Sequence, residues 1–449
     1  MPPTDWRAAV RDEWRARRAA DPAEKAIFPL AANPFGEEEI LAMADTILTG
    51  KLTLGANVER AEKYFAATVG ARYAVMVNSG SSANLLAVAA ACNPKREGAF
   101  LKPGDAVLVP AVCWSTSVFP LIQFGLKPVF VDVDAATLNV SRATLEAAAT
   151  AGVKALMAVH VLGNSAPMAD LLAFVRERGL LLIEDTCESL GSTFEHGGNA
   201  ATMLGTVGDF GTYSFYFSHH ITSGEGGMVV CQSKADFNLL RCLRAHGWTR
   251  HLTNAAEVEA AHPGIDPRFC FVNVGFNLRP MEVQGAMLNV QLAKMHDFNA
   301  CRRSNMARIS AALQADPSFA STMSIAQPGA GTDAAWFGIG AVLAADKAPH
   351  LAAYLAYLTE HGIENRPIIS GNFVRQPVIS AFCPDARPQD YPGAEAVHGR
   401  GFFIGVHQLP IPDATIGQLV QVMLGYAFDG AKGGAAVGGG AVAVRASAA

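Results

Sequence analysis

The chain has 449 residues, of which 50% are hydrophobic and 17% charged, and its formal net charge is −5. This length predicts a large α/β domain accompanied by a smaller one. A mildly acidic chain has no basic footprint for nucleic acid, and no run of about 18 or more apolar residues predicts a membrane span. We therefore expect a well-packed soluble enzyme that has neither nucleic acid nor membrane as a partner.

The first segment, residues 1–29, is charged and lacks the apolar core of a signal peptide, which favours a helical extension and a cytoplasmic location. Eight cysteines are scattered along the chain with no CxC or CxxC pair. Such spacing is typical of reduced, mostly buried thiols and not of a disulfide or metal framework.

From about residue 70 onward, short β-rich apolar runs alternate with helix-like segments, which predicts a mostly parallel sheet covered by helices on both faces. The expected strands are 74–78, 106–110, 128–132, 155–160, 180–185, 212–217 and 228–231. In such sheets, ligands collect at the carboxyl ends of the strands. We expect the large domain to span 30–300, with its binding site at that edge.

A long helix is expected over 280–312, and a smaller C-terminal α/β domain over 301–428. Asp413 is placed to cap a last helix over 414–428. The Ala/Gly-rich residues 429–449 predict a disordered tail, because glycine loses much conformational entropy on ordering.

Two motifs follow expected strands. Asn78-Ser79-Gly80-Ser81-Ser82 predicts a strand-to-helix turn whose backbone amides can approach a phosphate, although a plain serine-rich helix cap would look the same. Glu184-Asp185 ends an apolar run and places a carboxylate at a strand end, where a solvated turn residue is the alternative.

The stretch from Ser214 to Gly227 reads Ser-Phe-Tyr-Phe-Ser-His-His-Ile-Thr-Ser-Gly-Glu-Gly-Gly. It resembles the cofactor-lysine loop of the DegT/DnrJ/EryC1/StrS family of PLP-dependent sugar aminotransferases, with His219 at the lysine position. The missing lysine would form the Schiff base with PLP and shuttle protons. An imidazole cannot hold the cofactor in this way, but it exchanges protons near neutral pH. No lysine occurs between Lys154 and Lys234, so transamination with an internal lysine is not expected.

The resemblance covers about residues 30–425 and implies fold type I of the PLP enzymes, the aspartate aminotransferase-like fold. A carboxylate against the ring nitrogen is what makes PLP an electron sink. Alternatives from the residues alone are a core tryptophan for Trp114 and a surface glutamate for Glu188. The positions that match the family's cofactor site are Gly80, Ser81, Ser82 and Ser214 at the phosphate, Trp114 on the ring, Asp185 at the ring nitrogen and Glu188 beside the ring.

Gly275-Phe276-Asn277-Leu278-Arg279 resembles a family segment that crosses a dimer interface to the partner's cofactor phosphate. It implies a homodimer with shared active sites, in which Asn277 binds the cofactor and Arg279 the substrate. Arg250 and Arg375 are further candidates for a substrate diphosphate, because arginine forks suit phosphate oxygens. Solvated surface charges are the alternative for all three arginines.

With histidine at the lysine position, the chain resembles a small branch of the family. Enzymes of this branch remove the C3 hydroxyl of nucleotide-linked 4-keto-6-deoxyhexoses. One type acts on CDP-sugars and carries an iron–sulfur cluster, which needs four thiolates. Residues 232–300 contain only Cys242 and Cys270, so no cluster and no other metal is expected.

The other type needs no metal, acts on GDP-4-keto-6-deoxymannose and renews PMP from PLP with L-glutamate. The resemblance therefore implies a PMP/PLP-dependent lyase of 3,6-dideoxysugar biosynthesis, with His219 and Asp185 as catalytic residues. The alternatives are the same chemistry on a CDP- or dTDP-linked sugar and a catalytically inactive cofactor-binding homologue. The role of His220 stays open.

Overall fold

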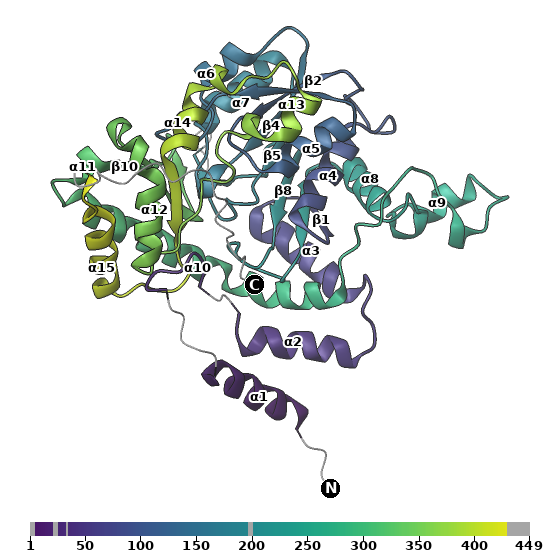
Figure 1. Cartoon of the computed structure of the whole chain (residues 1–449). Coiled ribbons are helices and arrows are strands. Elements are labelled where there is room, and N and C mark those ends of the chain that lie inside the picture. The colour runs from purple at the N-terminus through teal and green to yellow at the C-terminus, as the bar shows by residue number, and fades with distance from the viewer. Residues whose placement is uncertain (1–4, 21–25, 33–34, 196–200, 429–449) are drawn as a thin grey trace.

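The computed structural model describes residues 5–20, 26–32, 35–195 and 201–428, so the predicted tail at 429–449 lies outside it. A seven-stranded sheet of order β1-β9-β8-β5-β4-β2-β3 forms its centre (Figure 1). Only β9 runs antiparallel to its neighbours, which confirms a mostly parallel sheet. Its strands are β1 (Tyr73–Val77), β2 (Ala106–Pro110), β3 (Lys127–Val131), β4 (Val153–Val159), β5 (Leu181–Asp185), β8 (Phe210–Ser214) and β9 (Gly227–Cys231).

Helices cover this sheet, whose central strands are nearly continuous apolar runs because both faces are buried. Helix α4 (Gly80–Ala91) packs on β8 and β9 and is buried along most of its length. It starts three residues after β1 ends, so its N-terminus lies at an end of the sheet. The other helices of this part are α3 (Ala56–Val69), α5 (Ser115–Gln123), α6 (Arg142–Ala148), α7 (Met168–Arg178) and α8 (Lys234–Arg244).

A second, antiparallel sheet of order β10-β12-β13 lies in the C-terminal part of the chain. Helix α10 (Glu282–Gln314) joins the two parts, because it packs on α2 (Glu37–Leu48) and α3 at one end and on α15 at the other. The elements of this second part are β10 (Met323–Ile325), β12 (Gly338–Leu343), β13 (Gly401–Gly405), α11 (Phe319–Thr322), α12 (Leu351–Glu360), α13 (Pro377–Phe382), α14 (Pro392–Arg400) and α15 (Asp413–Leu424).

Helix α1 (Trp6–Ala20) lies beside α2, to which Arg7, Arg11 and Arg15 form ion pairs (Figure 1). At the right of the view, α9 (Ala255–Ala260) stands near the end of a projecting arm, residues 249–274 (Figure 1). A small sheet is made of β6 (Thr193–Phe194), β7 (Thr202–Met203) and β11 (Thr332–Asp333). None of the helices in the described ranges is long and apolar enough to cross a membrane.

The prediction that Asp413 caps the last helix is wrong. Pro412 precedes the helix, Asp413 is its first residue, and no side chain caps its N-terminus. The Asp413 carboxylate instead pairs with Arg308 on α10. The Asp413 side chain, which the local sequence pattern predicts to cap the helix, thus forms a long-range ion pair instead.

Candidate active site

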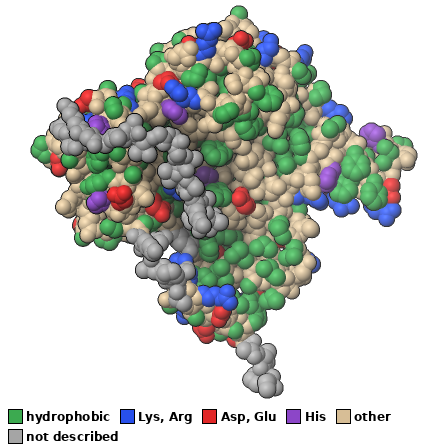
Figure 2. Space-filling model, viewed as in Figure 1, with side chains coloured by type: hydrophobic (Ala, Val, Ile, Leu, Met, Phe, Trp, Pro, Cys, Tyr) green, Lys and Arg blue, Asp and Glu red, His purple; other side chains and the backbone are tan. Residues whose placement is uncertain are grey.

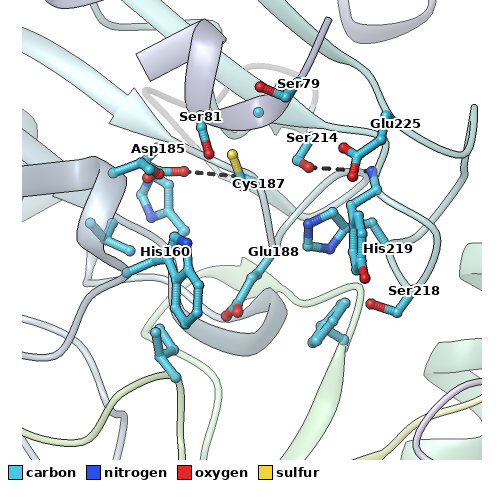
Figure 3. Close-up of a pocket in the computed structure, with 17 residues that line it drawn as sticks. Ser79, Ser81, His160, Asp185, Cys187, Glu188, Ser214, Ser218, His219 and Glu225 are labelled. Carbon is cyan, nitrogen blue, oxygen red and sulfur yellow. Dashed lines mark hydrogen bonds between the residues drawn. The ribbon is translucent and has the colours of Figure 1, made fainter. Parts of the chain in front are cut away.

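A cavity of about 400 Å³ lies where β4, β5 and β8 end, and polar side chains from several elements point into it (Figure 3). Residues from the second part of the chain, Phe337 and Ile369, also line it. The predicted site residues that it brings together are Gly80, Ser81, Trp114, Asp185, Glu188, Ser214 and His219.

The N-terminus of α4 forms one wall of this cavity. The Ser79 hydroxyl accepts the Ser82 N–H at 3.1 Å, which caps the helix. At Gly80 a Cβ atom would stand 2.5 Å from the Ser214 Cβ, so only glycine lets these two segments approach. The N-terminus of the helix therefore lies beside Ser214 at the cavity, an arrangement that suits a phosphate. Ser82 is not in the lining, because its hydroxyl accepts a hydrogen bond from Ser79 at 3.0 Å.

The Asp185 carboxylate is held in a fixed orientation at the end of β5. Its Oδ2 accepts from Asn84 Nδ2 at 2.8 Å and from Ser117 Oγ at 2.7 Å. Thr212 donates to Asn84 Oδ1 at 2.6 Å and so fixes the orientation of that amide. Because the Asp185 side chain is 5% exposed and held by these two donors, the alternative of a solvated turn residue does not hold.

Trp114 and Glu188 complete the cavity. Trp114 precedes α5 and is 57% exposed at the cavity, so it is not a core residue. Glu188 is not a surface residue either, because its Oε2 accepts the buried Leu162 N–H at 3.0 Å. Burial, with a smaller effect of the Asp185 charge, raises the pKa of Glu188 to about 7.

His219 lies in the loop after β8 with its ring 5.3 Å from that of Phe337. Its Nδ1 is buried and has no hydrogen-bond partner among the described residues, so Nε2 is the atom that can exchange a proton with a ligand. Burial and the positive charge of Arg302 lower the pKa of His219 to about 4. The imidazole is therefore neutral at pH 7 and ready to accept a proton.

His220 points away from the cavity. Its Nε2–H donates to the Ala335 carbonyl at 2.7 Å, and the side chain is buried. Its ring therefore binds the backbone of a neighbouring segment and does not line the cavity.

The remaining predicted residues lie outside the cavity lining. Asn277 Oδ1 accepts from Arg279 Nε at 2.9 Å, and Arg250 stacks on Trp248. Arg375 pairs with Glu395 through two hydrogen bonds. The lining within the described ranges includes Asp185, Glu188 and Glu225 but no lysine or arginine.

Several residues of the site were given no function from the sequence, although His160 stands at the end of an expected strand and Trp336-Phe337-Gly338 resembles a segment of the same branch of the family. His160 follows the last residue of β4, and its buried Nε2 lies 3.4 Å from Glu184 Oε2. Phe337 reaches the cavity from a segment 118 positions after His219 (337 − 219). Others that the sequence did not single out are Asn84, Ser117, Cys187, Thr212, Tyr216, Ser218 and Glu225.

The buried neutral histidines make the fold sensitive to acid. Burial lowers the pKa of His220 well below 6.5. As the pH falls below 6.5, the unfolded chain takes up a proton at this position that the folded chain does not, so the free energy of unfolding decreases. We expect His220→Asn to weaken the decrease between about pH 7 and pH 5, measured by urea denaturation. His296→Asn, at an exposed position, should leave the slope unchanged, and an equal slope in H220N and the wild type would contradict the assignment.

Curated relatives match most of the chain. A GDP-4-keto-6-deoxy-D-mannose 3-dehydratase of Yersinia pseudotuberculosis is 37% identical over 86% of this chain and 95% of that protein. A dTDP-4-dehydro-2,6-dideoxy-D-glucose 3-dehydratase of Saccharopolyspora spinosa is 34% identical over 86% of this chain and 83% of that protein.

Solved structures agree with this similarity. The GDP-4-keto-6-deoxy-D-mannose 3-dehydratase of E. coli with bound hydrated PLP superposes with a TM-score of 0.80 at 34% identity, over 88% of this chain and 99% of that one. A structure of the same enzyme type with a trapped PLP–glutamate geminal diamine gives the same score and identity, over 88% and 100% of the two chains. The model of the DegT/DnrJ/EryC1/StrS aminotransferase family matches residues 34–420. The chain belongs to the DegT/DnrJ/EryC1/StrS aminotransferase family.

Proposed function

We propose that the chain is a PMP/PLP-dependent 3-dehydratase of a nucleotide-linked 4-keto-6-deoxyhexose, with GDP-4-keto-6-deoxymannose as the favoured substrate. L-Glutamate would renew PMP from PLP. The observation that carries the proposal is a neutral histidine facing a well-formed cofactor cradle at the position where family members have lysine. The dehydratases at 34–37% identity support it.

Each part of the cavity has a task in this proposal. The α4 N-terminus with Ser81 and Ser214 holds the cofactor phosphate, Trp114 covers the ring, and Asp185 keeps a proton on the ring nitrogen. When bound, the cofactor supplies the amino group that joins the C4 ketone and a ring that accepts electrons. His219 Nε2 would take a proton from the cofactor C4′ carbon and pass it to the C3 hydroxyl, which would leave as water. In the glutamate half-reaction it would move a proton from the glutamate Cα to the same cofactor carbon. The released products would be a 3-deoxy-4-keto sugar and ammonia.

The charges of the cavity support a homodimer with shared sites. A cofactor phosphate and a sugar-nucleotide diphosphate bring several negative charges into a cavity whose described lining has no lysine or arginine. The projecting arm and the segment after it supply Arg250, Asn277 and Arg279 outside that lining. The arm also exposes apolar side chains, and basic ones line its lower edge in Figure 2. A second copy of the chain would bring this arm over the cavity.

A subunit-mixing experiment tests the shared site. His219→Asn and Arg279→Met should each inactivate the homodimer, because each removes a group from both sites. Unfolding and refolding the two variants together should restore about a quarter of the wild-type activity, since half of the dimers are mixed and each mixed dimer has one intact site. Mixing His219→Asn with Asp185→Asn is the control, and it should restore nothing because both residues belong to the same subunit's cavity. Failure of the first mixture to regain activity would place Arg279 in the site of its own subunit, and an active Arg279→Met homodimer would place it outside any site.

Mixing the purified protein with PLP and L-glutamate tests the reaction itself. Conversion of the PLP absorption to that of PMP is expected, and an inactive homologue would bind PLP without converting it. No conversion at any pH between about 6 and 9 would contradict the proposal.

A screen of GDP-, dTDP- and CDP-linked 4-keto-6-deoxy sugars, with ammonia release as the readout, distinguishes the nucleotides. The position of Arg375, already paired with Glu395, makes it the weakest of the three proposed substrate ligands. The cytoplasmic location stays a prediction.

A further inference from the structure

A buried arginine without a carboxylate partner lies near the proposed base. Arg302, in α10, is 3% exposed, and no ion pair joins it to an acid within the described ranges. Burial lowers the pKa of Arg302 to about 10, so it remains charged at neutral pH. Buried charges in proteins are usually paired, because removing an ion from water costs several kcal/mol. A buried arginine near His219 that pairs with no acid in the described ranges therefore needs an explanation.

Backbone carbonyl groups take the place of the carboxylate. Arg302 Nη1 donates to the carbonyl oxygens of Trp336 at 3.3 Å and Phe337 at 3.4 Å, and also to that of Val406. Its Nη2 reaches Gln408 Oε1 at 3.5 Å. Trp336 and Phe337 precede β12 and Val406 follows β13, so one guanidinium joins α10 to two strands of the second sheet.

The segment held in this way, Ala335–Phe337, forms one wall of the cavity through Phe337. The His220 Nε2–H bond to the Ala335 carbonyl holds the same segment, and Phe337 N–H donates to the Leu162 carbonyl at 3.0 Å. The Phe337 ring lines the cavity and packs on the His219 ring. A shift of the wall would therefore move the surface against which the imidazole rests.

We propose that Arg302 is a positioning residue for the proton transfer: it pins Ala335–Phe337 so that Phe337 holds His219 in place, and it sets an unpaired positive charge behind the imidazole. This inference rests on the proposed function of His219. It assigns a task to a residue far from the family's cofactor-loop motif.

The charge has a consequence for the histidine. The titratable groups that line the cavity with His219 are His160, Asp185, Cys187, Glu188, Tyr216 and Glu225. His220 lies next to His219 in the loop, and Arg302 is close enough for its charge to act on the imidazole. After burial, the Arg302 charge is the cause that lowers the pKa of His219. With this low pKa the imidazole is neutral at pH 7, which is the form that can accept a proton.

Two variants separate the charge of Arg302 from its hydrogen bonds. Arg302→Met removes both, and Arg302→Lys keeps the charge but loses the fork. Arg308→Met is the matched control, because Arg308 stands on the same helix and pairs with Asp413 away from the wall. His219 is titrated by NMR in the full-length PMP-loaded protein, with His219→Asn to assign its signal, and PMP formation from PLP and glutamate is timed over the same pH range.

We expect Arg302→Met to raise the titration midpoint of His219 toward 6.5 and to slow PMP formation by about 10- to 100-fold. Arg302→Lys should keep the low midpoint and lose rate, and Arg308→Met should change neither. A wild-type midpoint and rate in Arg302→Met would overturn the inference. If Arg302→Met does not fold, two other results would overturn the inference. One is a titration midpoint of His219 at or above 6.5 in the wild-type protein. The other is a rate of PMP formation in Arg302→Lys equal to that of the wild type. A wild-type protein that forms no PMP would refute the proposed function, whereas the titration would still test Arg302.

Discussion

His219→Asn should bind PLP with wild-type affinity and form PMP from glutamate about 10²- to 10⁴-fold more slowly, the range that a positioned acid–base group contributes. Asparagine fills similar space and keeps the loop polar, but it cannot accept a proton at neutral pH. Loss of sugar dehydration, followed as ammonia release, should accompany the loss of PMP formation, because both half-reactions move a proton at the same cofactor carbon. The absorption change from PLP to PMP in stopped flow measures the first half-reaction directly.

His296→Asn is the matched control, since His296 is exposed on α10, and it should keep the wild-type rate. A wild-type rate in His219→Asn would show that another group is the base. His219→Lys gives a second reading, because a lysine there would bind the PLP aldehyde covalently. Borohydride reduction and mass spectrometry would detect that bond, and its absence would mean that position 219 does not reach the reactive carbon.

Asp185→Asn is expected to slow PMP formation by about 10²- to 10³-fold, as for the loss of an electrostatic group that acts on the transition state. The amide keeps the shape of the carboxylate but removes the charge that, in the proposed mechanism, holds the proton on the ring nitrogen. The absorption maximum of the bound PLP should shift as well, which separates a change at the ring from a general loss of activity.

Ser117→Ala should cause a smaller loss than Asp185→Asn, because it removes one of two donors to Asp185 Oδ2 and leaves the charge in place. The control is Asp134→Asn, in a turn where the carboxylate accepts the Ala136 N–H. Equal rates in Asp185→Asn and the wild type would exclude Asp185 as the partner of the ring nitrogen.

The sequence predicted the architecture where local patterns are sufficient. Apolar runs with turn residues between them located all seven strands of the main sheet within two residues at their starts. The small residues after β1 located the strand-to-helix turn that borders the cavity, and the histidine at the lysine position indicated the branch of the family. Periodicity and turn chemistry depend on residues a few positions apart, so one chain without a structure is enough to find them.

Tertiary structure decided what each of these residues does. Asp185 takes its orientation from Asn84 and Ser117, which are 101 and 68 positions away, and no local pattern predicts that contact. The state of His219 depends on Phe337 and Arg302, which reach it only after the two parts of the chain have packed together. The sequence by itself therefore determined that a histidine replaces the lysine in an otherwise familiar cradle. The fold decided that this histidine is neutral and that it lies near Phe337 and the buried charge of Arg302. The reason is that burial and long-range contacts set the pKa of a side chain, whereas the local sequence does not.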